Sequence, residues 1–190
     1  IETLKENTKK WTVLAYPSNA CIETIDGINY IWQKETVEDF SILIGSYLPD
    51  AHWKIRYVAF EGKPEERAEE YTVFIDNTGK VFRIQHTWAP KKNGISRSKP
   101  AARGIALEMI KNLYNITPYD LKEISNVEIE QTSRKDYVFT FQDLSLHFTD
   151  KETKACIIIK IIGDTISDYY RCILPSTDWI SKDIIQNWNC

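Results

Sequence analysis

The sequence of 190 residues lacks the short motifs by which many enzymes are recognised. Its four cysteines form no CxxC pair, its three histidines are isolated, and HExxH, GxSxG, P-loop and GxGxxG patterns do not occur. These gaps argue against a zinc ribbon, a thioredoxin-like centre and a zinc hydrolase. We therefore predict no catalytic residues, no metal and no cofactor in this chain.

A strong net charge and a long apolar run are also missing. With 24 Lys and Arg against 27 Asp and Glu, the net charge of −3 gives no electrostatic reason to expect a nucleic-acid partner. The longest apolar run, at 155–163, is strand-sized and interrupted by Lys160, well short of the ~20 residues that a membrane span needs. We expect a soluble piece. Because it begins at Ile1, we expect a processed product or an excised segment of a parent that need not be soluble.

What is present is a strongly patterned chain, with 43% hydrophobic and 12% aromatic residues, which excludes disorder. In the first half, residues 11–33 read as strands that turn at Asp26-Gly27. A helical apolar face follows at 35–48, and then a half-buried strand at 52–62. Two further strands form a hairpin across residues 77–79.

The second half repeats this order. Ser98 caps a predicted helix that has Pro100 in its first turn and runs to about Tyr114. A capped turn is predicted at 117–121. Four strands follow, at 122–132, 136–142, 153–162 and 166–174, and a short helix begins near residue 176.

These patterns predict an α+β fold made of two tandem helix-plus-antiparallel-sheet units that share one core. The first unit spans residues 1–90 and includes an N-terminal hairpin, and the second spans 91–190. Each helix should cover one face of its own sheet. On the first helix, Val37, Phe40, Leu43 and Ile44 are predicted to face the sheet. On the second helix, one predicted apolar face is made of Ala102, Ile105, Ala106, Met109, Ile110 and Leu113.

One family resemblance adds to this reading. The order of helix, "TPYDL" turn and strands, together with "EEYTVFIDNTGKVFRI", resembles PepSY-like (cystatin-like) domains. More specifically, residues 47–90 are similar to the extracytoplasmic insert of some bacterial CPBP-type (CAAX-processing-like) intramembrane metalloproteases. "SRSKPAARGIAL", "SRKDYVFTFQD" and "IIIKIIGDTISDYYRCILPSTDW" follow in the same order. The chain departs from the pattern at 88–90, where Leu-Pro-Glu is expected, and at Tyr137, where Trp is expected.

The resemblance implies that the chemistry belongs to a membrane bundle carrying a Glu-Glu-x-x-x-Arg motif. The acidic stretch "EERAEE" does not supply that motif, because Glu70 and Phe74 stand where the arginine is required. The implied role is a non-catalytic, extracytoplasmic regulatory or substrate-recruiting domain, tethered to a membrane. Its partners would be the transmembrane region of the same parent or a peptide or protein substrate.

Two alternatives stay open. One is a stand-alone secreted or periplasmic PepSY-like protein that binds peptides or inhibits a protease, since an exposed sheet edge can add a peptide strand. The other is a small-molecule-binding α+β domain, which a deep pocket with convergent polar groups would favour.

The candidate binding residues lie in and around the acidic stretch. Arg56, Glu66, Arg67 and Glu70 could form a Glu–Arg network that fixes the strand crossing or a partner surface. The simpler interpretation is that Glu65, Glu66, Glu69 and Glu70 lie on a solvated turn or strand edge.

A second candidate group lies around the linker between the two units. His86 and Trp88 are either a packed pair or part of a ligand pocket between the units. The basic residues near the linker form a solvated face or, beside a membrane, meet lipid headgroups; they are Lys91, Lys92, Arg97, Lys99 and Arg103.

The final hairpin brings two cysteines into register. If Ile162 faces Ile166, then Lys160 faces Asp168 and Cys156 faces Cys172, which opposes unlike charges. The other register, with a two-residue turn at 163–164, separates the cysteines. In an extracytoplasmic location, Cys156 and Cys172 are a candidate disulfide, and two buried free thiols are the alternative.

Overall fold

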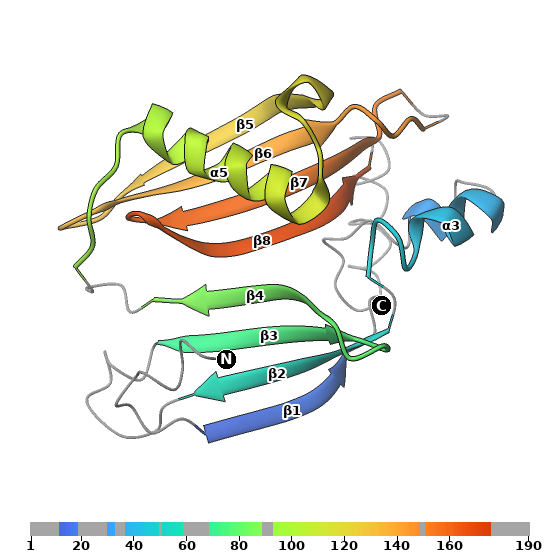
Figure 1. Ribbon diagram of the computed structural model, residues 1–190, viewed down its shortest axis with the longest axis horizontal. Helices are drawn as coiled ribbons and strands as arrows, with labels where there is room; N and C mark the ends of the chain where they lie inside the picture. The colour runs from blue at the N-terminus through green and yellow to red at the C-terminus, as the bar shows by residue number, and fades with distance from the viewer. Residues whose placement is uncertain are drawn as a thin grey trace, which may run out of the picture.

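The computed structural model describes residues 12–18, 30–32, 37–49, 51–58, 69–88, 93–148 and 151–175. Within them the fold is mixed, with two separate four-stranded antiparallel sheets (Figure 1). The strands of the first sheet, in spatial order, are β1 (Thr12–Ser18), β2 (His52–Val58), β3 (Glu70–Asp76) and β4 (Val81–Thr87). The strands of the second are β5 (Leu121–Glu130), β6 (Lys135–Asp143), β7 (Lys154–Ile162) and β8 (Thr165–Leu174).

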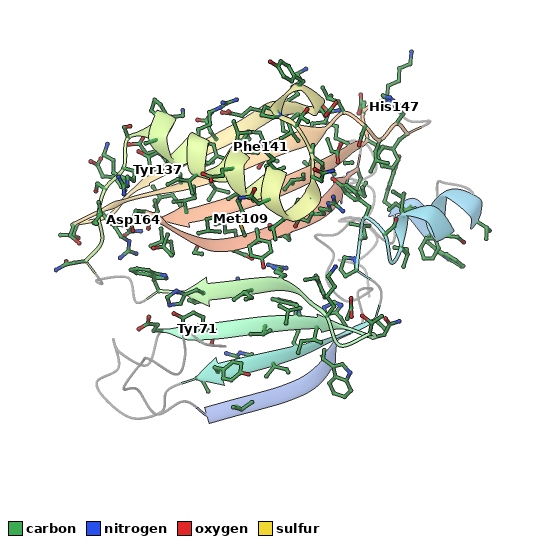
Figure 2. The ribbon with its side chains drawn as sticks, in the orientation of Figure 1. Tyr71, Met109, Tyr137, Phe141, His147 and Asp164 are labelled. Carbon is green, nitrogen blue, oxygen red and sulfur yellow. The ribbon has the colours of Figure 1, made fainter. Side chains whose placement is uncertain are left out.

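Helix α5 (Lys99–Tyr114) covers one face of the second sheet, as predicted (Figures 1 and 2). The helix starts after Ser98, although the Ser98 side chain makes no capping hydrogen bond, and it ends at Asn115 in a left-handed conformation. A 3-10 turn, η3 (Pro118–Asp120), leads into β5. The four strands that follow, β5 to β8, lie close to their predicted positions.

The predicted inner face of α5 is confirmed except at Leu113. The residues with no exposed surface are Ala102, Ala106 and Ile110, which pack on aromatic and isoleucine side chains of β6 and β7. Ile105 and Met109 are partly buried, but Leu113 is 43% exposed. The small alanines allow the helix to approach the bulky sheet closely, whereas Leu113 lies in the last turn of α5.

Helix α3 (Val37–Leu43) does not cover the first sheet, contrary to the prediction. Leu43 packs in a cluster with Ala155 and Ile173 of the second sheet, whereas Val37 is 74% exposed. Phe40 and Ile44 pack at the margin of the same cluster. Figure 1 shows α3 beside the ends of β7 and β8.

Residues 30–32 are helical, where the sequence predicted a strand. Tyr30 and Ile31 are fully buried in the cluster that also holds Leu43, and the Thr153 hydroxyl donates to the Tyr30 hydroxyl at 2.6 Å. Long-range packing therefore outweighs the local strand preference of these residues. The predicted turn at Asp26-Gly27 and the predicted C-terminal helix lie outside the described residues.

Strand β2 is buried at its two ends, His52 and Val58, whereas Trp53 is 51% exposed. The His52 ring lies 5.8 Å from the Phe74 ring and 5.3 Å from the Phe82 ring.

The β3–β4 hairpin forms where it was predicted. The Asp76 carboxylate accepts hydrogen bonds from the backbone N–H groups of Thr78 and Lys80, both at 2.9 Å, and Gly79 takes a positive φ of 87°. A carboxylate that bonds to the backbone two residues on is the usual reason for Asp at a turn. These bonds, and that of the Thr78 hydroxyl above all, lower the pKa of Asp76.

The β7–β8 register confirms the predicted pairing of Lys160 with Asp168 and of Cys156 with Cys172. At the turn the prediction was wrong: Ile162 faces Thr165, because the register shifts between residues 160 and 161. The candidate disulfide is not formed in the structure, although both cysteine side chains are buried. Burial raises the pKa of Cys156 to about 12, which keeps its thiol neutral.

The two sheets meet where β4 lies beside β8 (Figure 1). Arg83 of β4 donates to both carboxylate oxygens of Asp168, from Nε at 2.8 Å and from Nη2 at 3.0 Å. The guanidinium also stacks over the Phe74 and Tyr170 rings, at 4.5 and 4.3 Å. The Asp168 side chain is 2% exposed and the Arg83 side chain 14%, so the junction is a desolvated ion pair.

We expect Ile110→Ala to lower the free energy of unfolding by roughly 2–5 kcal/mol, because it empties a packed position under α5. Leu113→Ala removes the same kind of side chain from the same helix at an exposed position, and should cost less than about 1 kcal/mol. Urea denaturation of both variants measures the difference. Equal losses would contradict the helix orientation.

We expect Asp168→Ala to lower the free energy of unfolding by about 3–5 kcal/mol, because it leaves the Arg83 charge buried without its partner. The control is Asp164→Ala on the same hairpin. Asp164 lies 3.7 Å from Arg97 and is 30% exposed, so its loss should cost at most about 1 kcal/mol. A mild Asp168→Ala effect in thermal and urea unfolding would argue against the junction.

Candidate functional site

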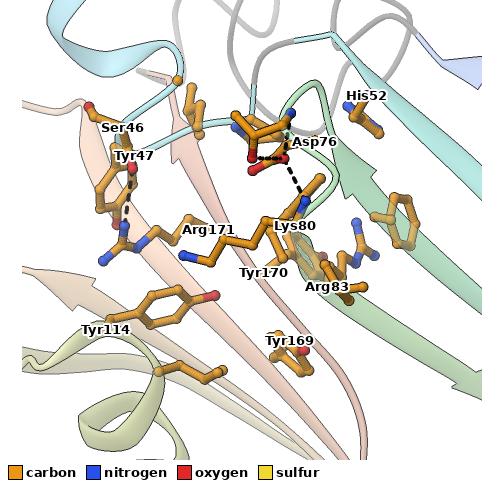
Figure 3. Close-up of a pocket in the computed structure, with 18 of the residues that line it drawn as sticks. Ser46, Tyr47, His52, Asp76, Lys80, Arg83, Tyr114, Tyr169, Tyr170 and Arg171 are labelled. Carbon is orange, nitrogen blue, oxygen red and sulfur yellow. Dashed lines mark hydrogen bonds between the residues drawn. The ribbon is translucent and has the colours of Figure 1, made fainter. Parts of the chain in front are cut away.

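A cleft of about 650 Å³ opens where the two sheets and the α3 segment meet (Figure 3). Its walls come from five separate parts of the chain: residues 45–49 after α3, the start of β2 at His52, the β3–β4 hairpin, the end of α5, and β8. Its cationic and bulky side chains include Tyr47, Lys80, Arg83, Leu113, Tyr114 and Arg171.

Arg171 lies between two tyrosine rings in this cleft. Its guanidinium carbon is 3.9 Å from the Tyr114 ring centre and 4.6 Å from that of Tyr47. Nη1 donates a long hydrogen bond of 3.5 Å to the Ser46 carbonyl, and the buried Nε has no hydrogen-bond partner. Among the described residues, no acid forms an ion pair with Arg171.

Both tyrosines stay neutral at physiological pH. Burial raises the pKa of Tyr114 to about 12, although the nearby Arg171 opposes the shift. Burial likewise raises the pKa of Tyr47 far above its usual range, and Asp143 adds to that rise. The phenol groups therefore do not neutralise the arginine.

Lys80 adds a second cation, and its side chain points toward Arg171 and Tyr114 (Figure 3). Arg83 also lines the cleft, but Asp168 already holds its guanidinium. Asp76 is engaged by the backbone of its own turn. The cleft therefore presents excess positive charge beside aromatic walls.

His86 and Trp88 do not line this cleft. The predicted packed pair is confirmed, with ring centres 5.1 Å apart, and the His86 ring also stacks on Tyr71 at 3.9 Å. The prediction of a solvated Glu69 was wrong. Glu69 is 3% exposed, and its Oε1 lies 2.9 Å from His86 Nε2, so it belongs to this cluster.

Arg56 and Glu70 form an ion pair across β2 and β3, on side chains that are 37% and 26% exposed. This pair is the Glu–Arg contact that the sequence suggested between neighbouring strands. Glu66 and Arg67, the other two candidates of that network, lie outside the described residues, as does Glu65.

Sequence reasoning missed the cleft. Its cations and rings are far apart in the chain, and each one alone reads as an ordinary strand or helix residue. The closest signal was the prediction that a deep pocket with convergent polar groups would favour ligand binding.

Within the described ranges, no group of three or more His, Cys, Asp or Glu side chains could hold a metal ion. In the same ranges, no helix has the length and hydropathy to cross a membrane. Neither a protein-family model, nor a curated protein, nor a solved structure matches this chain.

We expect Glu69→Ala to lower the free energy of unfolding by about 1–3 kcal/mol, because the buried His86 ring loses a hydrogen-bond partner. Glu128→Ala removes an equivalent carboxylate from an exposed pair with Lys135 and should change stability by no more than about 0.5 kcal/mol. Urea unfolding of the two variants measures the difference. Coinciding unfolding curves would contradict the burial of Glu69 beside His86.

Proposed function

We propose that this chain is a non-catalytic extracytoplasmic domain that recruits substrate to, or regulates, a bacterial membrane protease. In this proposal residues 1–90 and 91–190 are tandem PepSY-like units. The ordered similarity of residues 47–179 to CPBP-type inserts supports the family assignment. The succession of α5 and four antiparallel strands in the second half is consistent with it.

The cleft between the sheets is the observation that carries the recruiting role. Both sheets contribute side chains to it, so a bound segment would contact both halves of the chain. Concave sites lined by aromatic groups, with a few well-placed polar groups, are typical of ligand binding. We expect the ligand to be a peptide segment of the protease substrate.

A small-molecule ligand is the second candidate, and the size of the cleft favours it. Its volume of about 650 Å³ lies inside the usual range of roughly 300–1,000 Å³ for small-molecule sites. Peptide and metabolite mixtures applied to the same immobilised domain separate the two candidates.

We expect the immobilised domain to enrich a subset of peptides from a proteome-derived peptide mixture and to leave them uncleaved, with or without zinc. Leu113→Trp fills the cleft from an exposed wall position and should abolish the enrichment. Leu144→Trp, at a residue of similar exposure outside the cleft lining, should not. Mass spectrometry of bound and unbound fractions measures both effects. Zinc-dependent cleavage that disappears on mutating one histidine would overturn the non-catalytic role.

A further inference from the structure

Two cations converge in the cleft, and no described acid pairs with either of them. Within the described part of the chain, the long bond to the Ser46 carbonyl is the one hydrogen bond of Arg171, and its buried Nε donates to no acceptor. Lys80 extends toward it from the β3–β4 hairpin (Figure 3). Lys80 is exposed to solvent, but burying the Nε–H of Arg171 without an acceptor is costly.

The nearby acids are already engaged. Asp168 receives both Arg83 hydrogen bonds and lies 3.5 Å from the Lys160 ammonium. Asp76 accepts bonds from its own turn. Neither carboxylate is available to Arg171, so the described part of the chain leaves an acceptor position open.

The two tyrosine rings restrict how that position can be filled. The guanidinium carbon lies over the Tyr47 and Tyr114 rings, at 4.6 and 3.9 Å from their centres. Because these rings occupy the space around it, we expect an incoming acceptor to meet the guanidinium at its N–H edge. A planar carboxylate matches that edge through two parallel hydrogen bonds. Because both phenols remain neutral at physiological pH, they do not repel an anion.

We propose that Arg171 binds a carboxylate of the ligand, with Lys80 as a second electrostatic partner. The carbon skeleton of the ligand lies against Leu113 and the aromatic wall of the cleft. This inference deepens the proposed function, and it rests on that function only in taking the ligand to be a peptide. The carboxylate is either a C-terminus or an acidic side chain.

Blocked tripeptides test the proposal directly. The probes are acetyl-Ala-Phe-Ala with a free C-terminus, the same peptide as its amide, and the amides of acetyl-Ala-Glu-Ala and acetyl-Ala-Gln-Ala. Titration calorimetry measures affinity, and the NMR signal of the Arg171 Nε–H group reports contact at the site. Benzoate and inorganic phosphate serve as probes without a peptide backbone.

We expect the carboxylate form of at least one peptide pair to bind about 10-fold or more tightly than its uncharged counterpart and to shift the Arg171 signal. A preference within the Phe pair identifies a C-terminal carboxylate, and one within the Glu/Gln pair identifies an acidic side chain. Arg171→Gln and Arg171→Lys should both remove the preference, because lysine lacks the planar fork. Lys80→Gln should weaken it. Arg103→Gln, on an exposed arginine paired with Glu123, should not change it.

The alternative outcomes separate the two proposals. If charged and uncharged peptides bind equally, the carboxylate site is overturned and peptide recruitment stands. If benzoate binds in an Arg171-dependent way and no peptide binds, the carboxylate site stands and peptide recruitment fails. Phosphate binding more tightly than every carboxylate, or no probe binding at all, overturns the inference. Should Arg171→Gln fail to fold, the paired peptides and Lys80→Gln still decide it.

Discussion

The ion pair between Arg83 and Asp168 is the contact on which the arrangement of the two sheets depends. The sheets share no backbone ladder, so the junction of β4 and β8 must be specified by side chains. A bidentate pair enclosed by Phe74 and Tyr170 provides direction as well as attraction. Lone pairs and protons left unsatisfied in such a place would be costly, and here both carboxylate oxygens and two guanidinium nitrogens are used.

The segment that connects the sheets is held by contacts of a different kind. Asp136 accepts from Arg134 and from the Gly163 backbone, each at 3.0 Å. Gly163 has a φ of +63°, and a Cβ there would come within 2.9 Å of the Ile95 carbonyl oxygen. The Tyr137 hydroxyl donates to the Arg97 carbonyl at 3.0 Å. The linker is therefore fastened to the β7–β8 turn, which sets where the chain leaves the first sheet and enters α5.

The cleft follows from these two constraints. Joining the sheets through Arg83 and Asp168 places the β3–β4 hairpin opposite the end of α5, and α3 closes the remaining side because it packs on the second sheet. Arg171 of β8 then lies in the cleft that these elements enclose. Its charge is stabilised by ring stacking but lacks a matched anion among the described residues, a combination suited to binding an anionic ligand.

Features that depend on neighbours along the chain could be predicted from the sequence. The 3.6-residue pattern between Ser98 and Tyr114, the turn residues at Asp76 to Gly79, and the charge match of Lys160 with Asp168 each have a local physical cause. Three other features emerge only from the packed fold: Leu43 packs on the second sheet, Glu69 is buried beside His86, and Arg171 meets Tyr47 and Tyr114. These outcomes depend on contacts between residues far apart in the chain, and the free energy of such packing outweighs the local preferences that a sequence pattern records.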